Sequence, residues 1–165
     1  MNGTSTLALL FGSYDVSIDE KNRMLVPVEI RRAIDPATDG DAFIMVPGVN
    51  RKPWLYPEKY YKSLALQLHS EMAPGEDELA FDQLNFAMAS RVEWDKQGRI
   101  VIPEKFILKS KLSRDVTVAG SRDHVEIWNR ADWVAREEEL EARRTEIAVR
   151  AKQRQSGSGS TGSGL

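Results

Sequence analysis

The sequence contains no cysteine and only two histidines, His69 and His124, among its 165 residues. The lack of cysteine excludes a disulfide framework and thiolate metal sites. Two histidines far apart in the chain are too few for a histidine-based zinc site without much help from carboxylates. We therefore expect neither a metal site nor another cofactor.

Long apolar runs are also missing. The longest one near the N-terminus, Leu7 to Phe11, has five residues and no basic segment before it. It is too short for a secretory signal or a membrane span, so we expect a cytoplasmic protein without a membrane partner. With 41% hydrophobic residues and four tryptophans, the chain can still bury a core, as one domain or two small modules.

A strong basic excess is the third absence, since the net charge is -2. The overall value argues against a nucleic-acid partner, because phosphate binding favours a basic surface. The distribution of charge argues the other way. Residues 19–32 carry four basic and three acidic side chains, residues 95–109 carry four and two, and the acidic surplus lies mainly in 71–82 and 137–141.

What the sequence does contain is a repeat. Asp19–Pro27 returns 76 residues later as Asp95–Pro103, with Asp, Arg, Pro and an apolar triplet in register. In each copy an apolar-polar strand, 14–18 or 91–94, precedes a polar four-residue loop and a second, apolar strand, which predicts a duplicated β-hairpin. The residue before the arginine is Asn22 or Gly98, and both types tolerate positive φ well, so we expect a left-handed backbone there.

Each copy continues in the same order. A short helix is expected at 28–33 or 104–111, followed by a strand at 42–46 or 116–119 and a last strand at 54–56 or 126–128. The sequence thus predicts two ββαββ modules. Since neither is long enough to bury both faces of four short strands, we expect the two to intertwine into one pseudo-dimeric β-barrel.

A helical pair is predicted between the modules. Tyr61, Leu64 and Leu68 follow Pro57 at helical spacing, Pro74 and Gly75 break the pattern, and a second apolar series resumes it with Phe81, Leu84 and Met88. We expect an α-helical hairpin that packs on the barrel, with Leu64 and Leu84 facing inward. A small-molecule site is not indicated, because convergent polar groups are missing.

The C-terminal part reads as a charged helix and a tail. Asn129 can cap a helix that runs to about Arg154, with an apolar stripe of Trp133, Leu140 and Ile147 and the ion pairs Glu139–Arg143 and Glu146–Arg150. This helix is either solvated or a contact between subunits. The expected boundaries are module 1 at 13–60, linking helices at 61–88, module 2 at 89–132, the C-terminal helix at 133–154 and a disordered Gly/Ser-rich tail at 155–165.

These motifs together resemble the MraZ family over roughly Phe11 to Trp133. The resemblance rests on the following segments: Gly12–Tyr14, Ile18–Pro27, Ala89–Trp94, Asp95–Pro103 and Asp123–Trp128. The sequence departs from the family pattern at Asn22, where a loop glycine is usual, and at Ile107, which stands where the first copy has the basic Arg31.

The resemblance implies an α+β fold of two AbrB-type swapped-hairpin modules. It implies a cytoplasmic, nucleoid-associated transcriptional regulator, a repressor of the division and cell wall gene cluster. Its expected partners are double-stranded DNA, through tandem direct repeats in its own promoter, and further copies of itself in a ring-like homo-oligomer.

The candidate DNA-binding residues come from the two loops. An arginine fork matches guanine O6 and N7, and a lysine gives a sequence-blind contact to phosphate. Arg23 is the leading base-reading candidate. Lys21 is a candidate for a phosphate contact or a second base contact, and Arg31 is a candidate for a contact from the helix to the DNA backbone. The second copy offers Lys96, Gln97 and Arg99 as counterparts. Because it has glutamine where the first copy has Lys21 and isoleucine where the first copy has Arg31, we expect the first copy to dominate the contact with DNA.

An internal interpretation of the arginines stays open. Asp19 precedes Arg23 by four residues, as Asp95 precedes Arg99, so each pair could be a salt bridge that closes its loop without any role for DNA. In either case we expect Asp19, Asn22, Asp95 and Gly98 to shape the loops.

Three other classes of function remain. An enzyme is disfavoured, because no nucleophile, phosphate-binding loop or catalytic residue can be recognised. An AbrB-like antitoxin that binds a toxin through its C-terminal extension is the nearest alternative, although such chains usually carry one hairpin. The third class is a structural ring protein without specific DNA affinity.

Overall fold

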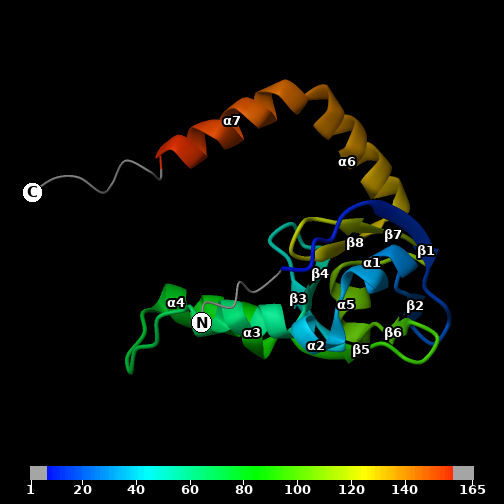
Figure 1. Cartoon of the computed structure of the whole chain (residues 1–165), viewed down its shortest axis with the longest axis horizontal. Helices are drawn as coiled ribbons and strands as arrows, with labels where there is room; N and C mark the ends of the chain where they lie inside the picture. The colour runs from blue at the N-terminus through cyan, green and yellow to red at the C-terminus, as the bar shows by residue number, and fades with distance from the viewer. Residues whose placement is uncertain (1–6, 158–165) are drawn as a thin grey trace, which may run out of the picture. The chain divides into compact units, whose positions relative to one another are not determined.

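The computed structural model describes residues 7–157. The chain divides into two compact units, Met1–Arg130 and Ala131–Leu165. The first unit holds both repeats and the helices between them, and the second holds the charged C-terminal segment (Figure 1).

The two repeats form the strands of the first unit. The first repeat consists of β1 (Ser13–Ser17), β2 (Arg23–Leu25), α1 (Val28–Ala33), α2 (Pro36–Asp39), β3 (Ala42–Pro47) and β4 (Pro53–Pro57). The second consists of β5 (Ser90–Glu93), β6 (Arg99–Val101), α5 (Glu104–Lys109), β7 (Asp115–Gly120) and β8 (Val125–Asn129). The second repeat has the expected ββαββ order. The first gains the short helix α2, because the Asp35 carboxylate accepts the Ala37 N–H at 3.0 Å and Pro36 fits the first helical turn.

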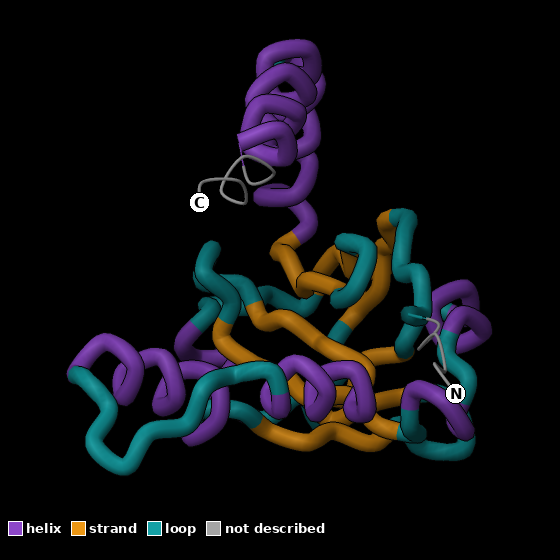
Figure 2. The backbone as a smooth tube through the Cα atoms, turned by 60° about the vertical axis from the view of Figure 1, so that its left-hand side comes forward, coloured by secondary structure: helices purple, strands orange, loops and turns teal. Residues whose placement is uncertain are grey.

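Strands of the two repeats mix in one antiparallel sheet with the order β1-β7-β8-β4-β3-β5. Exchanging the repeats gives the same order from the other end, so the first unit has an internal pseudo-twofold arrangement. The pairs β1–β7, β3–β5 and β4–β8 all join different repeats. The repeats are therefore intertwined, and Figure 2 shows the strands of this unit grouped together with helices around them.

The prediction of a β-barrel is wrong, because the sheet does not close. The six-stranded sheet is open, with β1 and β5 at its two edges, and β2 pairs with β6 in a separate two-stranded ribbon. β2 and β6 are only three residues long and pair with each other, and the Arg23 and Arg99 carbonyls also accept the Asp19 and Asp95 N–H groups of their own loops. They extend the core beside the sheet and leave its edges unjoined.

Equivalent positions of the two repeats fill one core. The pairs Met24 and Ile100, Val26 and Ile102, and Ile30 and Phe106 are each 76 residues apart, and all six side chains are buried. A core built in this way needs both copies, because each supplies only half of the apolar surface. Leu10 is also fully buried, since residues 10 and 122 exchange two backbone hydrogen bonds at 2.8 Å.

The segment between the repeats forms α3 (Glu58–Leu66), α4 (Glu76–Asp82) and the π-helix η1 (Gln83–Ala87). The expected inward position of Leu84 is wrong, because its exposed fraction is 48%. The Met88 N–H donates to the Gln83 carbonyl, five residues back, and such a wide turn shifts the helical periodicity by one residue. Leu64 is half-buried.

The second unit contains two helices among its described residues, not one. α6 (Arg130–Ala142) and α7 (Arg144–Gly157) are separated at Arg143. The predicted ion pairs Glu139–Arg143 and Glu146–Arg150 are confirmed at 3.4 and 2.8 Å. α7 extends three residues into the expected tail, whose remainder, 158–165, lies outside the described residues.

Asn129 does not cap a helix as predicted. Its side chain holds the loop before β7, accepting the Ser113 N–H at 2.7 Å and donating to the Lys111 carbonyl at 2.9 Å. A helix that could span a membrane is not found among residues 7–157.

Candidate nucleic-acid interface

Each hairpin loop is closed by its aspartate. One oxygen of Asp19 accepts the backbone N–H groups of Lys21 and Arg23 at 2.9 and 2.8 Å, and the other accepts Arg23 Nε at 2.6 Å. The backbone bond from Arg23 is the main cause of a lowered pKa for the Asp19 carboxyl. The aspartate thus fixes the loop and the arginine together.

The second loop repeats this geometry. Asp95 accepts the backbone N–H groups of Gln97 and Arg99 at 2.9 and 3.0 Å, and Arg99 Nε at 3.0 Å. The φ angles of Asn22 and Gly98 are +61° and +79°, which confirms the expected left-handed backbone at both positions. The loops therefore match in both hydrogen bonding and conformation.

The ion pairs leave most of each arginine fork unused. Only Nε binds the aspartate, and within residues 7–157 the terminal nitrogens of Arg23 and Arg99 make no hydrogen bond. Their side chains are 33% and 31% exposed. The internal salt bridge is present in both loops, and it orients each guanidinium while its two Nη groups remain able to donate.

The β2–β6 ribbon sets the position of both forks. Arg23 lies opposite Val101, Met24 opposite Ile100 and Leu25 opposite Arg99. The central pair Met24 and Ile100 is buried, so the two flanking pairs occupy the outward face. Because the strands are antiparallel, the two loops lie at opposite ends of the ribbon.

Arg31 lies at the second loop and not at the first. Its Nε donates to the Val26 carbonyl at 3.0 Å, and the Val26 N–H donates to the Gly98 carbonyl at 2.9 Å. A Cβ at Gly98 would overlap the Arg31 guanidinium. The basic residue that the second repeat lacks at Ile107 is thus supplied to its loop by the first repeat.

The remaining candidates lie on the exposed loop surface. Lys21, Lys96 and Gln97 are all exposed, and the side chains of the two lysines have no hydrogen-bond or ion-pair partner among the described residues. Each end of the ribbon therefore carries an anchored arginine and a free lysine. The second end also carries Arg31.

The outward apolar residues of the ribbon were missed by sequence reasoning. Leu25 and Val101 are 45% and 57% exposed, although both belong to the apolar triplets that suggested core strands. The signal that could have found them is the period of two along a strand, because a buried Met24 or Ile100 forces its neighbours outward.

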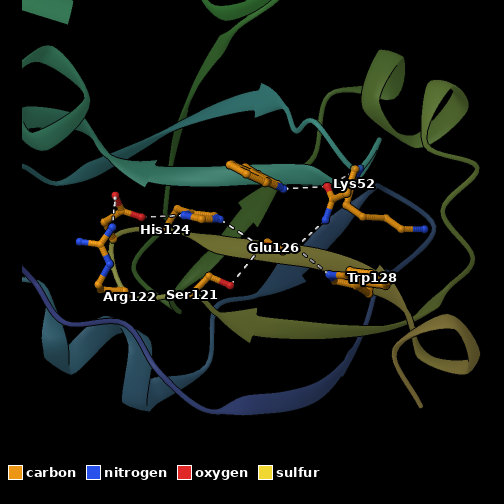
Figure 3. A network of polar contacts seen from close by, with 9 residues as sticks. Lys52, Ser121, Arg122, His124, Glu126 and Trp128 are labelled. Atoms are coloured by element: carbon orange, nitrogen blue, oxygen red, sulfur yellow. Dashed lines mark hydrogen bonds and ion pairs between the residues drawn. The ribbon is translucent and has the colours of Figure 1, made fainter. Parts of the chain in front are cut away.

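A second polar cluster lies where β4 meets β8 (Figure 3). The Glu126 carboxylate accepts hydrogen bonds at 2.8 to 3.1 Å from four side chains, those of Asn50, Ser121, His124 and Trp128. His124 is 8% exposed, stacks on Trp54 with ring centroids 4.0 Å apart and also bonds Asp123 at 2.7 Å. Asn50 and Trp54 come from the first repeat, so the cluster joins the two copies.

Hydrogen bonds within this cluster stabilise the charged forms of Glu126 and His124. Burial alone would raise the pKa of Glu126, but the hydrogen bonds from His124 and its neighbours outweigh burial and lower the pKa to about 2. Burial alone would likewise lower the pKa of His124, but hydrogen bonds to Glu126 and Asp123 raise it. The cluster is a buried imidazole between two carboxylates, and in the described part of the chain no group of three or more such side chains is arranged so that it could hold a metal ion.

Comparison with known proteins identifies relatives over most of the chain. The family model described as "MraZ protein, putative antitoxin-like" matches residues 85–155. A protein of Thermomicrobium roseum named "Transcriptional regulator MraZ" is 33% identical over 142 residues, which cover 86% of this chain and 96% of the relative. Proteins with the same name from Pediococcus pentosaceus and Acetivibrio thermocellus are 30% and 32% identical, over 85% and 76% of this chain and 94% and 84% of the relatives. Relatives at this identity over nearly their full length show that the chain belongs to the MraZ family.

Proposed function

We propose that this chain is a transcriptional regulator that binds DNA sequence-specifically through the β2–β6 ribbon and its two loops. The observation that carries the proposal is the pair of arginine forks, Arg23 and Arg99, each held through Nε with its Nη groups free. A two-stranded ribbon fits the major groove of B-DNA, and an arginine fork donates two bonds to guanine O6 and N7.

The surrounding charges suit this role. Lys21 and Lys96 lie on the loops next to the forks, where an ammonium group can contact phosphate without reading sequence. Arg31 adds a third cation at the second loop. Both loops can therefore contact DNA. The second loop has Gln97 where the first has Lys21, and Arg31 supplies the positive charge that this glutamine lacks.

The name of the relatives supports regulation of transcription. We further propose that the chain represses the division and cell wall gene cluster in the cytoplasm, at the nucleoid, by binding tandem direct repeats in its own promoter. The alternating strand pairs are consistent with two AbrB-type swapped-hairpin modules.

Self-association into a ring is part of the proposal. The helices between the repeats expose a group of large apolar side chains, which is unusual for a monomer: Leu66, Leu68, Leu79, Phe81, Leu84, Phe86 and Met88. Several ribbons acting together on tandem repeats would gain affinity through effective concentration. Light scattering should then detect a species well above a dimer, and Phe81→Ser should lower its mass.

The antitoxin alternative rests on the C-terminal extension. A disordered tail that folds on a toxin is what that function requires, whereas residues 131–157 are helical apart from the break at Arg143. The structure of this unit thus gives the antitoxin alternative no specific support.

A fluorescence-anisotropy titration tests the function. The probe is a labelled duplex from the region directly upstream of this chain's own coding sequence, compared with a scrambled duplex of equal length at two salt concentrations. We expect tighter binding to the promoter duplex, and weaker binding of both duplexes at higher salt. Equal affinity for the two duplexes would contradict sequence-specific regulation.

A further inference from the structure

We propose that Leu25 and Val101 contact thymine methyl groups and set part of the sequence preference. This inference rests on the proposed DNA-binding function and concerns the same ribbon. Both residues lie on its outward face, between the two arginine forks.

The strand alternation explains why these two residues point outward, but nothing within the chain explains why both are apolar. Leu25 and Val101 are 45% and 57% exposed, whereas the residues before them, Met24 and Ile100, are 1% and 0% exposed. An isolated exposed apolar residue is ordinary on a protein surface. Here the same position is exposed and apolar in both repeats, and the strands that carry it are the two that leave the main sheet.

The register places each apolar side chain beside a fork. Val101 lies directly opposite Arg23, and Leu25 directly opposite Arg99, so their Cβ atoms are about 4.5 to 5.5 Å apart. Along one strand, Arg23 and Leu25 are two residues apart, about 6.7 Å, which is close to two base-pair steps of about 3.4 Å. A fork that meets guanine therefore brings an apolar group to a base nearby.

The chemistry of the major groove matches this alternation. Guanine presents two acceptors there, and thymine presents the C5-methyl group, the only apolar group at that edge among the four bases. Apolar side chains read thymine through this methyl. A ribbon whose outward face has an arginine fork and an apolar side chain in each cross-strand pair can thus read guanine and thymine together.

A second copy of the ribbon is a less suitable occupant for this face. Packing two such faces together would bring four guanidinium groups close to one another, and like charges at short range repel. Nucleic acid suits both the charge and the apolar pair.

Deoxyuridine substitution isolates the methyl group. The promoter duplex is prepared with thymine or with every thymine replaced by uracil, which removes the methyl and keeps the base pair. We expect the wild-type chain to bind the uracil duplex about four-fold more weakly for each methyl that it contacts. A scrambled duplex with the same replacement shows whether uracil affects binding in general, and its affinity should not change.

Three variants complete the test. Leu25→Ala and Val101→Ala should each bind the two promoter duplexes more nearly alike, and the double variant should not distinguish them. Val49→Ala is the matched control, because Val49 is 92% exposed in the turn between β3 and β4 and should leave the discrimination unchanged. Circular dichroism checks that the variants remain folded.

The outcomes separate the two proposals. Equal affinity of the wild-type chain for the thymine and uracil promoter duplexes, with preference over scrambled DNA retained, would overturn the methyl contact alone. Full discrimination by the folded double variant would also overturn it. Loss of preference between promoter and scrambled DNA in the wild-type chain would instead overturn the DNA-binding function itself.

Discussion

Arg31 of the first repeat lies against Gly98 of the second, and a Cβ at position 98 would displace the Arg31 guanidinium. The equivalent position in the first loop is Asn22, which has a side chain, and the position of the second repeat that corresponds to Arg31 is Ile107. The two loops thus differ at this position: the second has a glycine against which Arg31 lies, and the first has an asparagine. The asymmetry leads to the first prediction.

Gly98→Ala should destabilise the fold by about 1 to 2 kcal/mol, because an alanine at φ +79° is strained and its Cβ displaces the Arg31 guanidinium. Chemical denaturation measures the change. Adding Arg31→Ala to Gly98→Ala should recover only the part of the lost stability that comes from overlap with the arginine. This part is the smaller one, because the far end of Arg31 is flexible and can move aside. Asn22→Gly is the matched control, and we expect a change below about 1 kcal/mol, because glycine accepts the same backbone angle. A stable Gly98→Ala protein with unchanged DNA affinity would show that the contact is unimportant.

Arg23→Ala and Arg99→Ala should each cost about 1 to 3 kcal/mol of binding free energy and relax the discrimination between promoter and scrambled DNA. The physical reason is the loss of two Nη donors aimed at guanine. Lys21→Ala should weaken binding to both duplexes more equally and reduce the salt dependence by about one phosphate contact. Anisotropy titrations at several salt concentrations measure both effects.

Stability must be measured on the same arginine variants, because each arginine also bonds its aspartate. These ion pairs are partly exposed, so we expect the loss of either to lower the free energy of unfolding by less than about 1 kcal/mol. A folded Arg23→Ala protein that keeps its preference for promoter DNA would remove Arg23 from the interface. In that case the salt bridge would be its whole role.

The stability of the fold should depend on pH through His124. Because the pKa of His124 is raised in the folded state, its contribution is complete below the unfolded value of about 6.5 and is lost as pH rises through the folded pKa. Glu126 affects stability in the acidic range. Because its pKa is lowered to about 2 in the folded state, its contribution to stability is present above pH 4.5 and is lost as pH falls from there toward 2.

Urea denaturation between pH 5 and 8 measures the histidine effect. We expect the wild-type chain to lose stability across this range, and His124→Gln to lose distinctly less. His69→Gln is the control, because the side chain of His69 is 84% exposed and its loss should leave the slope as it is. Identical slopes for the wild-type chain and His124→Gln would contradict the contribution of the buried imidazole.

Leu84→Ala should cost less than about 1 kcal/mol in a monomeric chain, because nearly half of the side chain is already exposed. Leu55→Ala at a 1% exposed position of β4 should cost about 2 to 5 kcal/mol. Thermal melts at several protein concentrations compare the two. A large effect of Leu84→Ala that grows with concentration would mean that another copy covers this face.

The sequence was sufficient for features that depend on local chemistry. Asn22 and Gly98 adopt positive φ because few other residue types do so without strain, and the motif placed them before the arginines. The strand and helix pattern of each repeat also followed from local periodicity, and the helix at Val28–Ala33 has the predicted bounds. The hydrogen bonds that Asp19 and Asp95 accept join residues at most four positions apart, so the spacing alone could suggest them.

Only the tertiary structure decided how distant segments meet. The pairing of strands from different repeats, the crossing of Arg31 to the second loop and the joining of Asn50 to Glu126 all connect residues more than 40 positions apart, where sequence periodicity carries no information. The face of Leu84 was misjudged because periodicity indicates which side chains share a face, whereas packing decides whether that face is covered, and Phe81, Leu84 and Met88 are all at least 39% exposed. Local conformation follows from the steric limits of each residue, whereas the partners of a side chain depend on how the whole chain packs.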